Sequence, residues 1–356
     1  MPANLKHQNF IDLMKAAGML LIIFGHIIGD PSNFYNQLTQ PVHTKQIGVA
    51  FFVFITGWGL ANNTKPPLKS VYNRIFPFYF YGIVFAIFLS ILFIFLKGDT
   101  NPSNYLPFFF GANVFFDNFP ANPTTWYIGT YLHMLLFWYF FIQGKDIGKK
   151  HLVLAFIFEN IVRCLFMAWG KDFIAYMLLP NWLTVFLLGM YLHKKRQLAT
   201  TPQVFLLILA WLGVIAVWTY LTKSIGFDGA FPFRNMTSDF SMALPVESLL
   251  ISATYIVNTL FFFEIARRLP GFSIVSFLAR ATLITVIVHM PIVFGAHAQF
   301  YGLFESEMVA RITFIFVLYF GIAVFSELLQ RFINIKYLSE KSWLLLNRVF
   351  SSFKAT

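Results

Sequence analysis

Cysteine and charged residues are scarce in this 356-residue sequence. Its one cysteine is Cys164, so the chain can form neither an internal disulfide nor a metal site built from cysteines. Only 12% of its residues are charged, whereas 58% are hydrophobic and 20% are aromatic. Since a soluble domain typically has about 25% charged residues, the composition excludes an ordinary water-soluble enzyme.

Long apolar runs make up most of the sequence instead. Runs of about 18 to 25 hydrophobic residues recur along almost the whole chain, and such a run crosses a bilayer as a helix. We therefore predict an all-α polytopic membrane protein, a bundle of about ten transmembrane helices. The predicted spans are residues 10–29, 47–61, 75–96, 124–142, 152–169, 174–192, 204–222, 243–264, 274–296 and 309–331. The first span carries Asp12 and Lys15 and no small-residue cleavage site follows it, so we expect a membrane helix and not a cleaved signal peptide.

Lysine and arginine are distributed unevenly between the two sides of this predicted bundle. The net charge is +11. With Arg331 at the end of the last span counted in the C-terminal tail, 17 of the 26 basic residues fall in the two tails and the even-numbered loops, against five in the odd-numbered loops. This is the positive-inside pattern, which places both termini in the cytoplasm. We expect one transmembrane domain over residues 1–331 and a basic amphipathic cytoplasmic tail over 332–356. The charge therefore indicates a lipid bilayer as the partner, and no nucleic acid.

Two longer connections fall on the predicted outer side. Residues 97–123 and 223–242 combine aromatic residues with polar ones. Such loops either cover a site or bind a partner, or they pack on the membrane surface. The aromatic-rich composition, typical of AT-rich codons, indicates a multi-pass protein of a bacterial cytoplasmic (inner) membrane.

The first span carries a stripe of costly polar residues. Lys15 and His26 are eleven residues apart, which places them on one helix face about 16 Å apart along the axis. Asp12 lies three residues before Lys15, roughly on the same face. Asp12 and Lys15 have a second interpretation, as a neutralising pair near the inner interface. His26, far inside the span, either titrates in a site or bonds to another helix as a structural residue.

The ninth span repeats this theme, with Arg280 in its inner half and His289 in its outer half. By helical rise, His26 and His289 lie at similar depths, about 24 and 22 Å from the starts of their spans. Two histidines at one depth on parallel helices can face one cavity. Whether the two helices are neighbours does not follow from the sequence, and a hydrogen bond within the bundle is the alternative role for His289.

Other polar residues inside the spans have simpler interpretations. Glu159 and Arg163 are four residues apart, as in an ordinary structural ion pair. We expect His133 to be a packing or interfacial residue. Glu247 lies near the outer end of its span, where water can reach it. Arg74 precedes the third span and either anchors the interface or binds an anionic ligand from the cytoplasm.

Several stretches, in order along nearly the whole chain, resemble the acyltransferase-3 family of integral membrane O-acyltransferases. The hallmark is a basic residue, ten intervening residues and a histidine in the first helix, here Lys15 and His26. The other similar stretches are FFVFITGWGL at 51–60, RIFPFYFYG at 74–82, TTWYIGTYL at 124–132, FLLGMYLHKK at 186–195 and LARATLITVIVHMPIV at 278–293. Within this family, the sequence most resembles the subgroup of sugar or glycan O-acetylases.

This resemblance implies a reaction. An acyl group, an acetyl group in the O-acetylases, moves from cytoplasmic acyl-CoA to a hydroxyl of a cell-surface glycan or of its lipid-linked sugar precursor. Acetyl-CoA is then a co-substrate, and no cofactor or metal is expected. The implied product is an O-acetylated polysaccharide of the cell envelope.

The resemblance also distributes roles among the polar residues. His26 is the catalytic base or a transient acyl acceptor, Lys15 orients the donor, and Asp12 fixes Lys15. Arg74 and Arg280 contact the donor's phosphates or its pantetheine arm. The acceptor side is lined by His289, Trp126 and Glu247.

Two other functions fit the same composition. A glycan or lipid-linked-sugar exporter would use the polar stripes as a pathway and cleave no thioester. A non-catalytic membrane sensor or assembly partner would tolerate replacement of His26 and Lys15 but not of the outer loops.

Overall fold

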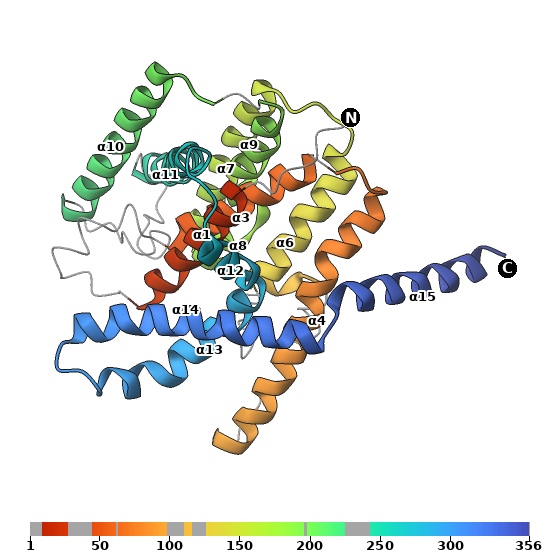
Figure 1. Ribbon diagram of the computed structural model, residues 1–356. Helices are drawn as coiled ribbons and strands as arrows, with labels where there is room; N and C mark the ends of the chain where they lie inside the picture. The colour runs from red at the N-terminus through yellow and green to blue at the C-terminus, as the bar shows by residue number, and fades with distance from the viewer. Residues whose placement is uncertain are drawn as a thin grey trace.

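The computed structural model describes residues 9–27, 45–61, 63–97, 110–115, 126–195, 198–224 and 243–355, and most of them are helical (Figure 1). No strand occurs in these ranges, so the all-α prediction is confirmed. The helices are α1 (Asn9–Ile27), α3 (Lys45–Ala61), α4 (Pro67–Lys97), η2 (Ala112–Phe115), α6 (Trp126–Phe137), η4 (Trp138–Ile142), α7 (Lys149–Ala168), α8 (Asp172–Met177), η5 (Leu179–Trp182), α9 (Leu183–Lys194), α10 (Thr201–Ser224), α11 (Ala243–Ala266), α12 (Ser273–Arg280), α13 (Thr282–Tyr301), α14 (Glu307–Phe332) and α15 (Ile335–Ala355).

Six of these helices are long and apolar enough to cross a membrane: α1, α4, α7, α10, α11 and α14. The pair α12 and α13 forms a seventh candidate, bent by 68° at a one-residue break at Ala281. Helix α3 and the segment Trp126–Ile142 are apolar but shorter. The chain is therefore a multi-pass membrane protein, with six or seven candidate spans among the described residues. The predicted outer loops lie outside those residues, apart from 110–115.

The predicted span 174–192 is not one helix. It consists of α8, the short η5 and α9 in succession. Pro180 lies in η5, and a proline has no backbone N–H to continue an α-helix. The carbonyl of Tyr176 accepts hydrogen bonds from the side chains of Asn181 at 3.0 Å and Trp182 at 2.9 Å. Side chains thus replace part of the helical bonding that the break removes.

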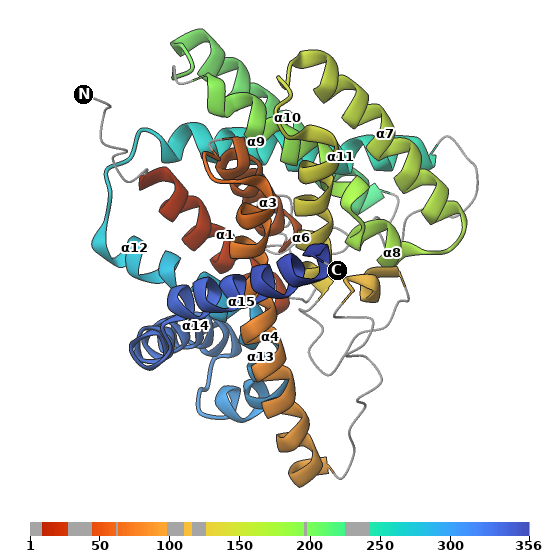
Figure 2. The same cartoon turned by 90° about the vertical axis from the view of Figure 1, so that its right-hand side faces the viewer.

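Helix α1 is the centre of the bundle. It contacts α3, α11, α12, α13 and α14, and Figures 1 and 2 both show it enclosed by other helices. Its Met14, Met19 and Ile23 are fully buried. Helix α10 packs at the periphery on α11. Helix α15 projects from the bundle and docks on α4, where the Tyr72 and Ser342 hydroxyls are 2.5 Å apart.

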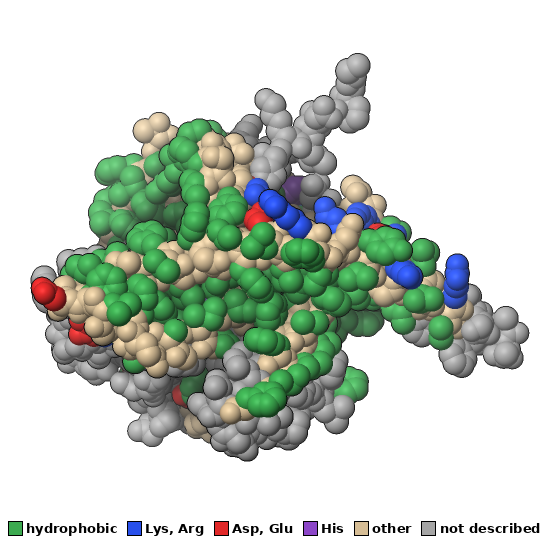
Figure 3. Space-filling model, turned by 60° about the horizontal axis from the view of Figure 1, so that its bottom comes forward, with side chains coloured by type: hydrophobic (Ala, Val, Ile, Leu, Met, Phe, Trp, Pro, Cys, Tyr) green, Lys and Arg blue, Asp and Glu red, His purple; other side chains and the backbone are tan. Residues whose placement is uncertain are grey.

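The surface is apolar over a broad face and charged at its ends. Figure 3 shows hydrophobic side chains across α14, with Lys and Arg gathered toward the side where α15 leaves and acidic groups at the end where α14 begins. Helix α14 begins at Glu307 and carries Arg331 in its last turn. Which of the two ends faces the cytoplasm stays a prediction.

Glycines let α3 pack backbone to backbone against two neighbours. A Cβ atom at Gly48 would lie 2.3 Å from the carbonyl oxygen of Gly18 on α1. On the opposite flank, a Cβ at Gly57 would lie 2.0 Å from the carbonyl oxygen of Phe186 on α9. Small residues at such crossings are the usual way in which membrane helices gain close packing.

The Gly57 crossing gives a stability prediction. We expect Gly57→Ala to destabilise the fold by about 1–3 kcal/mol, because a methyl group forces the α3 and α9 backbones apart. The measurement is the thermal unfolding midpoint of the purified protein in detergent. Gly213→Ala on α10 is the matched control, because a Cβ there meets no atom within 4 Å. Equal midpoints for the two variants would contradict this account of the crossing.

Candidate active site

Asp12, Lys15 and His26 lie on one helix, α1, as predicted, and they differ in burial. Asp12 is buried, whereas the side chains of Lys15 and His26 are partly accessible even though α1 is central. The intervening positions Met19 and Ile22 are buried and apolar. The stripe therefore offers two separate polar ends on one helix, about 16 Å apart.

Asp12 connects α1 to the ninth predicted span. Its carboxylate accepts a hydrogen bond of 2.7 Å from the Ser276 hydroxyl on α12. It also acts electrostatically on the Lys15 ammonium. The expectation that Asp12 positions Lys15 is consistent with this geometry, and Ser276 in turn fixes Asp12.

Arg74 lies at the same end as Lys15. Its guanidinium donates a hydrogen bond of 2.8 Å to the Gly59 carbonyl on α3 and another to the Tyr131 hydroxyl on α6. A Cβ at Gly59 would lie 3.4 Å from two guanidinium nitrogens, so a glycine leaves room for this side chain. Arg74 and Lys15 are close enough for each charge to act on the other.

This end of the stripe has an excess of positive charge. Two cations, Lys15 and Arg74, face one carboxylate, that of Asp12. Like charges held together away from bulk water repel each other, and an anion between them relieves the repulsion. The arrangement is therefore suited to a phosphate or another anionic group.

Two histidines meet at the other end. The ring centroids of His26 on α1 and His289 on α13 are 5.5 Å apart, with the planes tilted by 46°. The sequence placed both at one depth without showing that the helices are neighbours. The structure shows that α1 and α13 are in contact.

The tautomer of neutral His289 follows from its hydrogen bonds. Its Nδ1 lies 2.8 Å from the carbonyl oxygen of Thr285 and 3.1 Å from that of Val286. Carbonyl oxygens only accept, so Nδ1 carries the proton and Nε2 keeps a free lone pair. His289 is 1% exposed, and its Nε2 has no hydrogen-bond partner among the described residues. A buried nitrogen of this kind is available to accept a hydrogen bond.

Lys45 is a further charged residue at the histidine end, and sequence analysis gave it no role. It is the first residue of α3 and acts electrostatically on His26. Gly25 allows this approach, since a Cβ there would lie 2.8 Å from the Lys45 backbone nitrogen. Lys45 and His26 belong to different helices, so residue spacing along one helix could not predict that they are close.

The remaining predicted site residues lie in other surroundings. Arg280 is 54% exposed in its side chain and forms an ion pair of 2.7 Å with Glu327 on α14. Trp126 packs in an aromatic group with Tyr176, at 4.9 Å between centroids. Glu247 is buried on α11 at 4% exposure, and not accessible to water as predicted. These three positions stay predictions as site residues.

Glu159 and Arg163 form the predicted ion pair, at 2.7 Å and with both side chains buried. Arg163 also donates to Asn181 at 2.9 Å and to the Ser248 carbonyl at 2.6 Å. The other Glu159 oxygen accepts from the Thr184 backbone at 3.1 Å. Together, the hydrogen bonds of Glu159 and Arg163 connect α7, η5, α9 and α11. We therefore assign this network to the fold and not to the reaction.

Across the described ranges, no three His, Cys, Asp or Glu side chains are placed to hold a metal ion.

Comparisons with known proteins identify the family of this chain. The sequence matches the acyltransferase-3 family model, described as an acyltransferase domain, over residues 8–330. Comparison with curated proteins and with solved structures finds no match. The match includes Lys15, His26 and His289, and it covers most of the chain. The chain therefore belongs to the acyltransferase-3 family and is a membrane acyltransferase.

Proposed function

We propose that the protein transfers an acyl group, an acetyl group in the simplest case, from cytoplasmic acyl-CoA to a hydroxyl of a surface glycan or a lipid-linked sugar in a bacterial cytoplasmic membrane. One observation carries this proposal. Lys15 on α1 lies near Arg74 of α4, and about 16 Å further along α1, His26 lies beside His289 of α13. CoA is a long molecule with phosphates at one end and a thioester at the other. The two ends of the stripe match these two requirements.

The histidine pair supplies the proton transfers of the reaction. His26 accepts the proton of the acceptor hydroxyl while its oxygen attacks the thioester carbonyl. The C–O bond forms, the C–S bond breaks, and the departing sulfur takes the proton from His26. His289 lies beside this step with its Nε2 free to accept a hydrogen bond from the hydroxyl or from protonated His26. The products are the O-acyl sugar and CoA.

The basic end holds the donor in this proposal. Lys15 and Arg74 contact the phosphates, with Arg74 kept in place by Tyr131 and the Gly59 carbonyl. Arginine suits this task because its fixed donors match phosphate oxygens. Arg280, paired with Glu327 at the surface, is better suited to the mouth of the donor path than to its interior.

The sidedness of the reaction tests the proposal. Inverted membrane vesicles that expose the predicted cytoplasmic face receive radiolabelled acetyl-CoA. We expect label in the glycan or lipid-linked sugar fraction, and much less with right-side-out vesicles because acetyl-CoA does not cross the bilayer. Radiolabelled succinyl-CoA in a parallel reaction distinguishes the acyl group. Equal labelling from both orientations, or none from the inverted vesicles, would contradict a cytoplasmic donor.

Replacing the basic residues gives a prediction specific to the donor. We expect Lys15→Met and Arg74→Met each to raise the KM for acetyl-CoA about tenfold or more, because each removes a charged hydrogen bond to an anion. Lys69→Met on α4 is the matched control, since Lys69 pairs at the surface with Glu340 at 2.9 Å. A KM unchanged by both site substitutions would rule out these residues as the phosphate site.

A further inference from the structure

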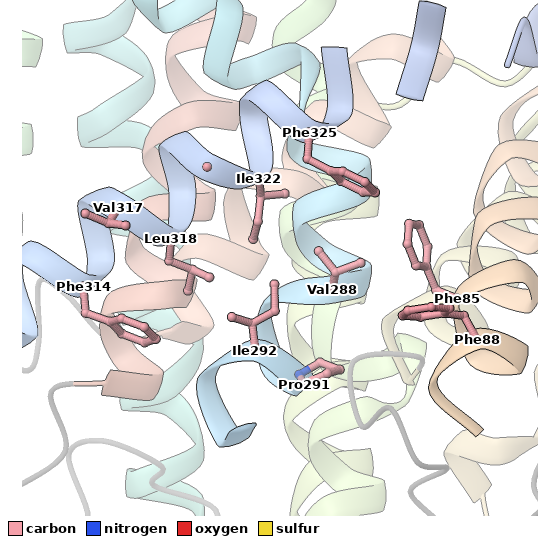
Figure 4. Close-up of a pocket in the computed structure, with 11 residues that line it drawn as sticks. Phe85, Phe88, Val288, Pro291, Ile292, Phe314, Val317, Leu318, Ile322 and Phe325 are labelled. Carbon is pink, nitrogen blue, oxygen red and sulfur yellow. The ribbon is translucent and has the colours of Figure 1, made fainter. Parts of the chain in front are cut away.

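An apolar pocket lies between α4, α13 and α14. Its volume is about 440 Å³, and Figure 4 shows side chains from the three helices turned toward one space. The lining residues are all apolar; six that define it are Phe85, Phe88, Val288, Ile292, Leu318 and Gly321. Such a space takes a hydrocarbon chain and offers nothing to a polar head.

The pocket opens toward the side of the protein that faces lipid. Phe88 is 58% exposed, and Val317 and Phe325 on α14 are 53% and 44% exposed. Helices α4 and α14 are both candidate membrane spans. In a bilayer, exposed apolar side chains on such helices contact hydrocarbon. A chain can therefore enter this pocket sideways from the membrane, without passing through water.

The pocket adjoins the histidine end of the stripe and not the basic end. Val288 and Ile292, which line it, are one residue before and three residues after His289 on α13. His289 turns toward His26 on α1, while its neighbours on the adjacent flank of α13 face the pocket. A lipid chain in this pocket therefore contacts residues that flank His289 on α13.

We propose that this pocket holds the hydrocarbon chain of a lipid-linked acceptor and so brings the acceptor's hydroxyl to His26 and His289. The inference rests on the proposed function, and it selects the lipid-linked sugar over a free surface glycan as the acceptor class. The chain belongs to the acceptor and not to the donor, because Lys15 and Arg74 mark the donor's end about 16 Å away along α1. The apolar contact adds affinity while leaving the chemistry to the histidines.

Gly321 allows a sharp test because it lines the pocket and carries no side chain. A Cβ at Gly321 meets no atom within 4 Å, so Gly321→Leu fills the pocket without forcing the backbone to move. Gly213→Leu on α10 is the matched control, with the same open surroundings on a different membrane helix. The probe is hexadecyl β-glucoside with a diazirine at the chain end, photoactivated on the purified protein in nanodiscs of phosphatidylethanolamine and phosphatidylglycerol.

We expect the probe to label peptides from α4, α13 and α14, and this labelling to fall about tenfold in Gly321→Leu but not in Gly213→Leu. Even labelling of all lipid-facing helices, or labelling that Gly321→Leu leaves unchanged, would overturn the pocket as a site and leave only surrounding lipid. Acetyl-CoA cleavage is measured in parallel on the same samples. Its absence in the wild type would count against the proposed function, whereas labelling alone decides the pocket.

Discussion

Replacing His26 by alanine is expected to lower acyl transfer by roughly 10²–10⁴-fold, the usual contribution of a positioned acid–base group. His26 is partly accessible on the central helix and lies 5.5 Å from His289 between ring centroids. His26 therefore lies beside the Nε2 of His289, which has no hydrogen-bond partner among the described residues. The measurement is label transfer from acetyl-CoA at equal amounts of folded protein.

Two further histidine substitutions make this result specific. His289→Ala is expected to lower the rate by a smaller factor, because His26 remains. His297→Ala is the matched control: His297 lies two turns beyond His289 on α13, and its Nδ1 likewise bonds a carbonyl of its own helix, that of Val293, at 2.7 Å. If His26→Ala transfers acyl groups at the wild-type rate, or if His297→Ala loses as much, the assignment of His26 is wrong.

Arg163→Leu is expected to lower the free energy of unfolding by about 3–5 kcal/mol, because it leaves the Glu159 carboxylate buried without its partner. Arg163 is 1% exposed. Its guanidinium donates to partners on three elements, α7, η5 and α11, among them Asn181 and Ser252 at 2.9 Å each. The measurement is thermal unfolding in detergent, together with the yield of monodisperse protein.

The double variant Glu159→Leu with Arg163→Leu is the informative comparison. Removing both charges avoids an unpaired buried ion, so the double variant is expected to be more stable than Arg163→Leu alone. Glu307→Gln, which breaks the exposed pair with Arg311 at the same i,i+4 spacing, is expected to change stability by less than about 1 kcal/mol. A double variant that is the least stable of the set would argue against a buried ion pair.

The alignment of the histidines could be predicted because it depends on local geometry alone. Helical rise gave the depths of His26 and His289, and the i,i+4 spacing gave the Glu159–Arg163 pair. Apolar run length gave six candidate membrane helices, α1, α4, α7, α10, α11 and α14, whereas the predicted span 174–192 is broken. Each of these features depends on the residues of one helix only, so it can be predicted from the sequence of that helix.

The features that sequence reasoning missed all depend on which helices are neighbours. The bond from Ser276 to Asp12 and the bond from Arg74 to Tyr131 each join residues of different spans. The ion pair of Arg280 with Glu327 likewise joins two spans, α12 and α14, while the role of Arg280 as a donor contact stays a prediction. The break at η5 had a local signal in Pro180, but a proline inside a membrane helix does not always end it.

The most direct test of the central claim is the stoichiometry of one reaction. Purified wild-type protein in nanodiscs receives radiolabelled acetyl-CoA and a lipid extract containing lipid-linked sugars, and both released CoA thiol and labelled sugar are measured. The account predicts one alkali-labile acetyl ester on sugar for each CoA released. Movement of lipid-linked sugar across the bilayer of proteoliposomes, with no CoA released in either preparation, would contradict it and indicate an exporter.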